Sequence, residues 1–212
     1  MSNETTTQTG RISGQLNQLA EIFTAVNLYA STDPNRGGLQ LAKISGNTIE
    51  ATDAYAALIY TISSTSSHNG LTTTPEPFTL PANEVTKALQ AAAKLAGKRA
   101  KDVAATITTT TTTWVLNTNW DQTITGHNPS YEWPNTSQIW HNAQTNPPAA
   151  TFEPFALAQW QIERLSKLTK LAGKDNTATL SHYSAPTKPM VYNVKTQHGQ
   201  AAALIMPAKI TS

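Results

Sequence analysis

An internal repeat is the feature that most constrains how this chain folds. The segment KLAGK occurs at Lys94–Lys98 and again at Lys170–Lys174, an offset of 76 residues (170 − 94). The same offset carries Trp114-Val115-Leu116 onto Met190-Val191-Tyr192. Because matching segments at a fixed spacing indicate a duplicated structural unit, we expect the two regions to fold alike.

The second unit is predicted to be a helix followed by three strands. Its helix follows Pro81, and apolar residues recur there at helical spacing. The threonine run Thr108–Thr113 favours a strand or hairpin over disorder, because β-branched residues suit a pleated strand. The predicted buried stripe of the helix is Val85, Ala88, Leu89, Ala92, Leu95 and Ala96, and the predicted strands are Val103–Thr113, Trp114–Asn117 and Trp120–Thr125.

The other two units have the same order of elements, which gives an α+β protein of three α-β-β-β modules. The third unit has a helix headed by Pro154, with an apolar face of Leu157, Trp160, Leu165, Leu168, Leu171 and Ala172. Its strands are predicted at Thr177–Leu180, Met190–Val194 and Ala201–Met206. The first unit lacks the sequence echo but has a helix at Gln15–Val26 and strands at Leu39–Ile44, Thr48–Thr52 and Tyr55–Ile62.

Composition excludes several classes of protein. A net charge of +2 excludes a strongly basic, histone-like protein. The absence of cysteine excludes disulfides, thiolate nucleophiles and Cys-ligated zinc. The longest run without a polar side chain, Ala201–Ala208, is far shorter than the ~20 residues of a membrane span. The N-terminus, MSNETTTQTG, has no signal-peptide pattern, so we expect a soluble protein of the cytoplasm.

No pattern typical of an enzyme is present, and we predict no cofactor and no metal. The acidic residues form no close pair suited to acid–base or two-metal chemistry, and no glycine-rich phosphate loop occurs. Asp53 is interpreted as a residue that caps or turns the chain between strands. The histidines lie scattered in predicted loops without metal-ligand spacing: His68, His127, His141, His182 and His198.

Four segments resemble the bacterial sliding clamp, the β subunit of DNA polymerase III. Ile49–Leu58 resembles the clamp's ATDGHRL-type segment, and Phe78–Ala82 resembles the strand and helix start that follow it. Gly126–Tyr131 resembles the G-x-x-P-x-Y segment between domains, with Trp133-Pro134 as an alternative anchor. Ala203–Ile210 is similar to the C-terminal VVMPMRL.

The resemblance covers roughly residues 12–210 and implies a shortened DNA-clamp fold, with helices inward and sheets outward. Clamps of the family have three domains of two modules each, whereas this chain has about one and a half. We expect a flexible N-terminus at 1–10, a complete domain at 11–134, a linker at 135–150 and a C-terminal half-domain at 151–212. Because phages commonly encode shortened clamps, the resemblance suggests a phage or prophage origin.

A sliding clamp, or processivity factor, encircles duplex DNA without reading bases, so basic residues are expected on the helices that face the DNA. The first helix departs from this pattern, with Gln15, Gln18 and Glu21 on its polar side. An ordinary solvated lysine face is the alternative interpretation. The predicted DNA-facing residues are Lys87, Lys94, Lys98, Arg99, Lys101, Arg164, Lys167, Lys170 and Lys174.

The resemblance also implies a pocket for clamp-binding peptides of polymerases and other partners. Its predicted wall is Thr52, Ala54, Tyr55 and Ala57 from the first unit, and Leu204, Met206, Pro207, Ala208, Lys209 and Ile210 from the last. Departures from the family pattern at Ala54, Tyr55, Ala56 and Lys209 leave the partner motif open. The alternative for Ala203–Met206 is an ordinary buried strand.

A half-domain has an exposed sheet edge, which pairing with a neighbouring copy would cover. Head-to-tail contacts close into rings. Clamp rings of the family have about a dozen modules and this chain has three, so the resemblance implies a homotetramer, with a trimer as the second possibility. The implied partners are duplex DNA, a polymerase and a clamp loader, in a bacterial or phage-infected cell. Two other functions stay open, a non-ring adaptor or decoy with the clamp fold and a structural protein rich in threonine.

Overall fold

The computed structural model describes residues 10–63, 71–145, 156–171, 173, 177–183, 185 and 188–207. Its helices are α1 (Leu16–Asn27), α2 (Ala82–Ala96), α3 (Ser137–Thr145) and α4 (Gln159–Lys170), with two 3-10 segments, η1 (Pro34–Gln40) and η2 (Gly97–Lys101). Its strands are β1 (Gly10–Gln15), β2 (Leu41–Ser45), β3 (Thr48–Thr52), β4 (Ala56–Ile62), β5 (Thr72–Thr73), β6 (Phe78–Pro81), β7 (Ala104–Thr109), β8 (Thr113–Thr118), β9 (Thr123–His127), β10 (Thr179–His182), β11 (Met190–Lys195) and β12 (Gly199–Ile205).

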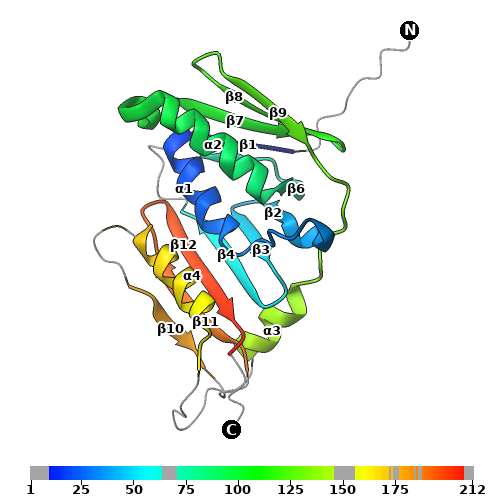
Figure 1. Cartoon of the computed structure of the whole chain (residues 1–212), viewed down its shortest axis with the longest axis vertical. Coiled ribbons are helices and arrows are strands. Elements are labelled where there is room, and N and C mark those ends of the chain that lie inside the picture. The colour runs from blue at the N-terminus through cyan, green and yellow to red at the C-terminus, as the bar shows by residue number, and fades with distance from the viewer. Residues whose placement is uncertain are drawn as a thin grey trace.

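The strands form two antiparallel sheets. One has five strands in the order β5-β1-β7-β8-β9, and the other has seven in the order β10-β11-β12-β4-β3-β2-β6. Helices α1, α2 and α4 are each followed by three consecutive strands that neighbour one another in a sheet. Figure 1 shows these three helices in front of the strands. The mixed helix-and-sheet architecture expected from the sequence is therefore confirmed.

The repeated KLAGK segments lie at the ends of equivalent helices. Gly97 follows the last residue of α2, and Gly173 lies shortly after α4. Both glycines have positive φ, +56° and +77°. A residue with positive φ ends a helix most easily when it is glycine, because glycine has no Cβ to clash. The repeat thus marks one helix-ending turn used twice.

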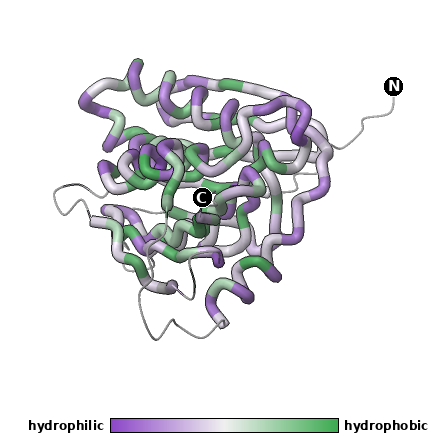
Figure 2. Tube along the Cα trace, turned by 60° about the horizontal axis from the view of Figure 1, so that its bottom comes forward, coloured by the Kyte–Doolittle hydropathy of each residue, from purple (hydrophilic) through white to green (hydrophobic). Residues whose placement is uncertain are grey.

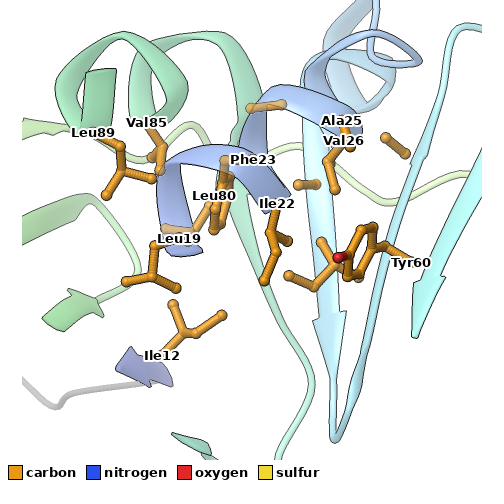
Figure 3. Packing of buried hydrophobic residues seen from close by; sticks show 14 of the residues in the cluster. Ile12, Leu19, Ile22, Phe23, Ala25, Val26, Tyr60, Leu80, Val85 and Leu89 are labelled. Carbon is orange, nitrogen blue, oxygen red and sulfur yellow. The ribbon is translucent and has the colours of Figure 1, made fainter. Parts of the chain in front are cut away.

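One hydrophobic core joins α1, α2 and α4 to both sheets. Leu19, Ile22, Phe23 and Val26 of α1 are completely buried, and they pack in one cluster with residues of α2 and of both sheets. Figure 3 shows these α1 side chains between Leu89 and Val85 on one side and Tyr60 on the other. In Figure 2 the hydrophobic, green segments gather toward the centre of the molecule. Helix α1 is therefore the central packing element of the fold.

Strands β4 and β12 join the first and third units. They pair antiparallel from Gly199 opposite Ile62 to Ile205 opposite Ala56. Since side chains alternate along a strand, residues 58, 60, 201 and 203 share one face, and all four belong to the core cluster under α1 and α4. Ala57 and Leu204 lie on the other face, where Trp140 of α3 packs on them. Helices α1 and α4 thus cover one face of this sheet, and α3 covers the other.

Three details differ from the sequence-based expectation. The strand predicted to end at Thr125 extends to His127 as β9, and Ser137–Thr145, within the predicted linker 135–150, forms α3. Leu95 was placed in the buried stripe of α2, yet it is 74% exposed, because no element within the described part of the chain packs on that side of the helix. Trp120 was placed in a strand, but it lies in the turn between β8 and β9, where Asp121 has a positive φ.

None of the helices in the described part of the chain is long and apolar enough to cross a membrane.

Candidate functional site

A pocket of about 450 Å³ lies where the first unit meets the third. The turn before β4, the start of α4 and the end of β12 form its walls. Three of its side chains, Tyr55, Trp160 and Met206, are large and hydrophobic, with exposed fractions of 56%, 39% and 38%. Exposed apolar side chains that gather at a concave surface are typical of sites that bind a partner. The full lining is Asp53, Tyr55, Ala158, Trp160, Gln161, Arg164, Met206 and Pro207.

Asp53 builds the turn on one side of the pocket. Its Oδ1 accepts hydrogen bonds from the backbone N–H groups of Tyr55 and Ala56, both at 2.9 Å. Ala54 has a φ of +77°, and its N–H donates to Thr52 Oγ1 at 3.1 Å. These bonds hold the backbone in a tight turn that directs Tyr55 outward. The turn-forming role predicted for Asp53 is confirmed.

Arg164 connects this turn to α4. Its Nη1 lies 2.6 Å from Asp53 Oδ2, and its Cζ lies 4.8 Å from the centre of the Trp160 ring. The guanidinium also lies 5.8 Å from the ring of Tyr29, whose phenol is buried. Burial raises the pKa of Tyr29, and the nearby positive charge of Arg164 opposes that rise. One arginine therefore fixes the distance between the two walls of the pocket.

Gln161 forms the third connection, at the floor of the pocket. It is 2% exposed, and its Oε1 accepts from the Ala158 N–H at 2.8 Å, which caps the start of α4. Its Nε2 donates to the carbonyl of Met206, just after β12 ends. The Met206 N–H in turn donates to the Tyr55 carbonyl at 3.3 Å. This chain of contacts places Met206 beside Tyr55.

The structure brings only part of the predicted pocket wall to this site. Tyr55, Met206 and Pro207 line the pocket. Thr52, Ala57 and Leu204 do not, because they are buried in the seven-stranded sheet at 4%, 5% and 2% exposure. Ala54 is exposed but does not line the pocket. Ala208, Lys209 and Ile210 lie outside the described residues.

Sequence reasoning missed the α4 side of the pocket. Trp160 was assigned to the buried face of the helix, and Gln161 was not singled out. The polar side chain of Gln161, within the first turn after a non-helical Ala158, is the signal that indicates a helix cap. Arg164 was predicted to face DNA. Its guanidinium is instead paired with Asp53, so we assign it to the pocket.

The remaining predicted basic residues are exposed wherever they are described. Lys87 and Lys94 lie on α2, and Lys167 and Lys170 lie on α4. Lys98, Arg99 and Lys101 lie in η2, because α2 ends at Ala96 and the helical spacing assumed for Lys98 does not continue. Lys174 lies outside the described residues.

A larger groove of about 660 Å³ lies at the opposite end of β4 and β12. Its lining is mostly Asn, Thr, Gln and Ser side chains, with Lys195 as its one charged group among the described residues and no aromatic ring. It therefore lacks the apolar anchor positions that the smaller pocket has. In the same described part of the chain, no group of three His, Asp or Glu residues could hold a metal ion.

Comparison of the whole fold with solved structures identifies its class. The chain superposes on the DNA polymerase sliding clamp of Caulobacter crescentus with a TM-score of 0.67 at 12% identity, covering 99% of this chain and 68% of that one. For the DNA polymerase III β subunit of Thermotoga maritima the TM-score is 0.62 at 12% identity, with 100% and 69% covered. For the β chain of Streptococcus pneumoniae it is 0.61 at 12%, with 96% and 66% covered.

The chain has the fold of the bacterial DNA polymerase III β sliding clamps, and it spans about two thirds of their length. The resemblance seen in the sequence is therefore confirmed at the level of the fold. No protein-family model and no curated protein sequence matches the chain.

Proposed function

We propose that this protein is a DNA sliding clamp, a processivity factor that encircles duplex DNA as a homo-oligomeric ring. It tethers partner proteins through the pocket lined by Tyr55, Trp160 and Met206. The observation that carries the proposal is the clamp fold over nearly the whole chain, with exposed lysines on α2 and α4. The protein acts by enclosing DNA and carries out no chemistry itself.

The distribution of lysines supports the DNA-binding part of the proposal. Lys87 and Lys94 on α2 and Lys167 and Lys170 on α4 all lie on exposed helix surfaces. Each lysine near a phosphate releases a condensed counterion, and this attraction is independent of base sequence. An enclosing protein needs only such contacts, since it must bind every sequence along which it slides.

The geometry of the pocket supports the tethering part. A partner peptide would place apolar side chains against Trp160, Tyr55 and Met206, and such anchors in a concave site supply most of the binding energy. Met206 suits varied partners because its unbranched thioether side chain adapts to different shapes. Polymerases and other replication proteins of a bacterial or phage-infected cell are the partners that this function requires, together with a clamp loader.

The number of units supports a ring of several copies. The chain has three helix-plus-three-strand units and about two thirds of the length of the clamps that it matches. About twelve units per ring would need four chains, so we propose a homotetramer, with a trimer as the second possibility.

Threading on linear DNA tests enclosure. A linear duplex that carries biotin at both ends is incubated with the protein. In one arm streptavidin blocks the ends after the protein is added, and in the other arm it blocks them before. A ring that threads over free ends is retained when the ends are blocked afterwards and excluded when they are blocked first. Equal retention in the two orders would contradict enclosure. Light scattering on the same protein is expected to give a mass near four times 22.8 kDa.

The second candidate function is an adaptor with the clamp fold that binds peptides without forming a ring. It is favoured by α1, whose twelve residues include no lysine or arginine. A monodisperse monomer at micromolar concentration that still binds a polymerase peptide would support this function over the ring.

A further inference from the structure

Strand β9 is an open sheet edge. It is the last strand of the five-stranded sheet, and among the described residues no strand pairs with its outer side. The Asn128 N–H donates to the Thr112 carbonyl, and the Gln122 carbonyl accepts from the Thr118 N–H. The backbone N–H and C=O groups of even-numbered residues therefore point toward β8. Because hydrogen-bonding direction alternates along an antiparallel strand, Thr123, Thr125 and His127 direct their N–H and C=O groups outward. The sequence of β9, TITGH, has no proline, lysine or carboxylate to block pairing.

The junction between β4 and β12 shows how such an edge is covered in this fold. Each strand is the third strand after its helix, and the two pair antiparallel. Every pair on the helix-facing side joins a large residue to glycine or alanine, so that the surface under the helices stays filled without overcrowding. These pairs are Ile62 with Gly199, Tyr60 with Ala201, Leu58 with Ala203 and Ile205 with Ala56.

Strand β9 is also the third strand after its helix, and it offers the same combination to a second copy of itself. Ile124 packs against the core on the helix-facing side, and Gly126 lies two residues further along the same face. A Cβ on Gly126 would lie 2.4 Å from the indole of Trp114, so this position must stay small. An antiparallel pair of β9 strands can therefore set Ile124 of one copy opposite Gly126 of the other.

The register of such a pair follows from side-chain alternation. Residues directly opposite each other point to the same face, so the two residue numbers must add to an even total. Pairing Thr125 with its own counterpart gives Ile124 opposite Gly126 and Thr123 opposite His127. A shift by two residues would set Ile124 against Ile124 or Gly126 against Gly126, and neither pair has one large and one small member.

We propose that two copies of this chain associate through β9, antiparallel about a two-fold axis at Thr125, and extend the five-stranded sheet across the contact. This deepens the proposed ring and relies on the proposed function only for ring closure. It differs from the head-to-tail contact expected from the sequence. The other end strands of the two sheets among the described residues are β5, β6 and β10, and none of them is the third strand after a helix. Copies that meet β9 to β9 alternate in direction, so a ring built this way has an even number of chains. The tetramer fits this requirement and the trimer does not.

A single introduced cysteine tests the contact, because the chain has no cysteine of its own. In the proposed register the two Cα atoms of residue 125 lie about 5.5 Å apart, within the range of a disulfide. Thr125→Cys is therefore expected to form a disulfide-linked species of twice 22.8 kDa on mild oxidation at low micromolar concentration. Thr123→Cys is the matched control, since it lies on the same exposed face but opposite His127 of the other copy. It is expected to stay uncrosslinked, whereas Thr123→Cys with His127→Cys is expected to crosslink.

The outcomes separate this contact from the ring itself. Crosslinking through Cys at 125 but not at 123 supports the two-fold contact. An oligomer by light scattering in which neither the 125 variant nor the 123/127 double variant crosslinks overturns the β9 contact and leaves the ring in place. A monomer in which no variant crosslinks overturns both. Equal crosslinking at 123 and 125 indicates random collision and also overturns the proposed register.

Discussion

Arg164 Nη1 lies 2.6 Å from Asp53 Oδ2, and this ion pair holds α4 of the third unit against the turn of the first. The side chain of Asp53 is 11% exposed and that of Arg164 is 23% exposed, so the pair is shielded from most solvent. Asp53 uses its other oxygen to fix the turn that presents Tyr55. The aspartate therefore serves the local turn and the contact between units at once.

A double-mutant cycle is expected to detect this coupling. Arg164→Met leaves Asp53 partly buried without its cation, so we expect a loss of about 2 kcal/mol in the free energy of unfolding. Asp53→Asn keeps one acceptor for the turn but removes the charge. The two changes together should cost less than the sum of the single changes, with a coupling of about 1 kcal/mol or more in urea unfolding. Strict additivity would show that the two side chains do not stabilise one another.

Trp160→Ala is expected to weaken binding of a clamp-binding peptide. Truncating an aromatic anchor typically costs more than about 1.4 kcal/mol, which is a tenfold or greater rise in Kd. Fluorescence anisotropy with a labelled C-terminal peptide of a bacterial replicative polymerase measures it. Ile162→Ala is the matched control, because Ile162 is on the same helix and 54% exposed but does not line the pocket. Equal affinity of the two variants would remove the pocket from the proposed function.

Neutralising lysines on the helices is expected to reduce the salt dependence of DNA binding. Lys94→Gln with Lys167→Gln removes two charges from α2 and α4, so the slope of log K against log salt should become shallower by about 1.8. Lys43→Gln with Lys195→Gln is the matched control with the same change of charge. Lys43 and Lys195 alternate with core residues in β2 and β11, so they lie on the α3 face of the sheet. If the two pairs change the slope equally, the DNA does not contact the helix surfaces.

The sequence predicted helices α1, α2 and α4 and most strands because their determinants are local. KLAGK contains the glycine that ends each helix, and positive φ at Gly97 requires no tertiary partner. The run Thr108–Thr113 became two strand ends and a turn, in which Thr110 and Thr113 are hydrogen-bonded. β-branched residues favour that outcome wherever they occur in a chain.

The α4 side of the pocket could not be predicted from the sequence, because it is formed by tertiary contacts between residues far apart in the chain. Arg164 looked like one more cation on a basic helix, and only the fold brings Asp53 to it, 111 positions earlier in the chain (164 − 53). Similarly, α3 has too little hydrophobic periodicity to be recognised. It forms because Trp140 and Ala143 find an apolar face on β4, β11 and β12. The exposure of Leu95 could not be predicted for the same reason. A periodic pattern identifies the apolar face of a helix but does not say how much of that face another element covers.

Gly199→Ala is expected to weaken the junction between the first and third units. A Cβ at this position would lie 2.1 Å from the carbonyl oxygen of Thr61, which is backbone and cannot swing aside. We expect a loss of about 2 kcal/mol, and therefore a fall of several degrees in Tm. Gly46→Ala is a useful comparison, since a Cβ at Gly46 would have no atom of the described residues within 4 Å. Only the φ of +55° opposes a side chain there, and we expect a loss of about 1 kcal/mol in the free energy of unfolding. A smaller effect at Gly199 than at Gly46 would contradict the β4–β12 register.

The last prediction concerns alkaline pH and Tyr60, whose hydroxyl lies 2.5 Å from Thr196 Oγ1 across the same junction. Burial raises the pKa of Tyr60 from 10.0 to about 12. Between these values the unfolded chain has lost the phenolic proton and the folded chain has kept it. The stability contributed by the neutral phenol is therefore complete below pH 10 and is lost as the pH rises toward 12, by about 1.4 kcal/mol per pH unit.

Tyr60→Phe tests this prediction, because phenylalanine keeps the packing and cannot ionise. Urea unfolding at several pH values between 9 and 12 is expected to give a shallower decline for the variant than for the natural chain. Tyr29 contributes in the same direction, since burial also raises its pKa, so the variant keeps part of the decline. If the two proteins lose stability at the same rate with pH, Tyr60 does not stay protonated in the folded chain above pH 10. The junction would then admit water around the phenol.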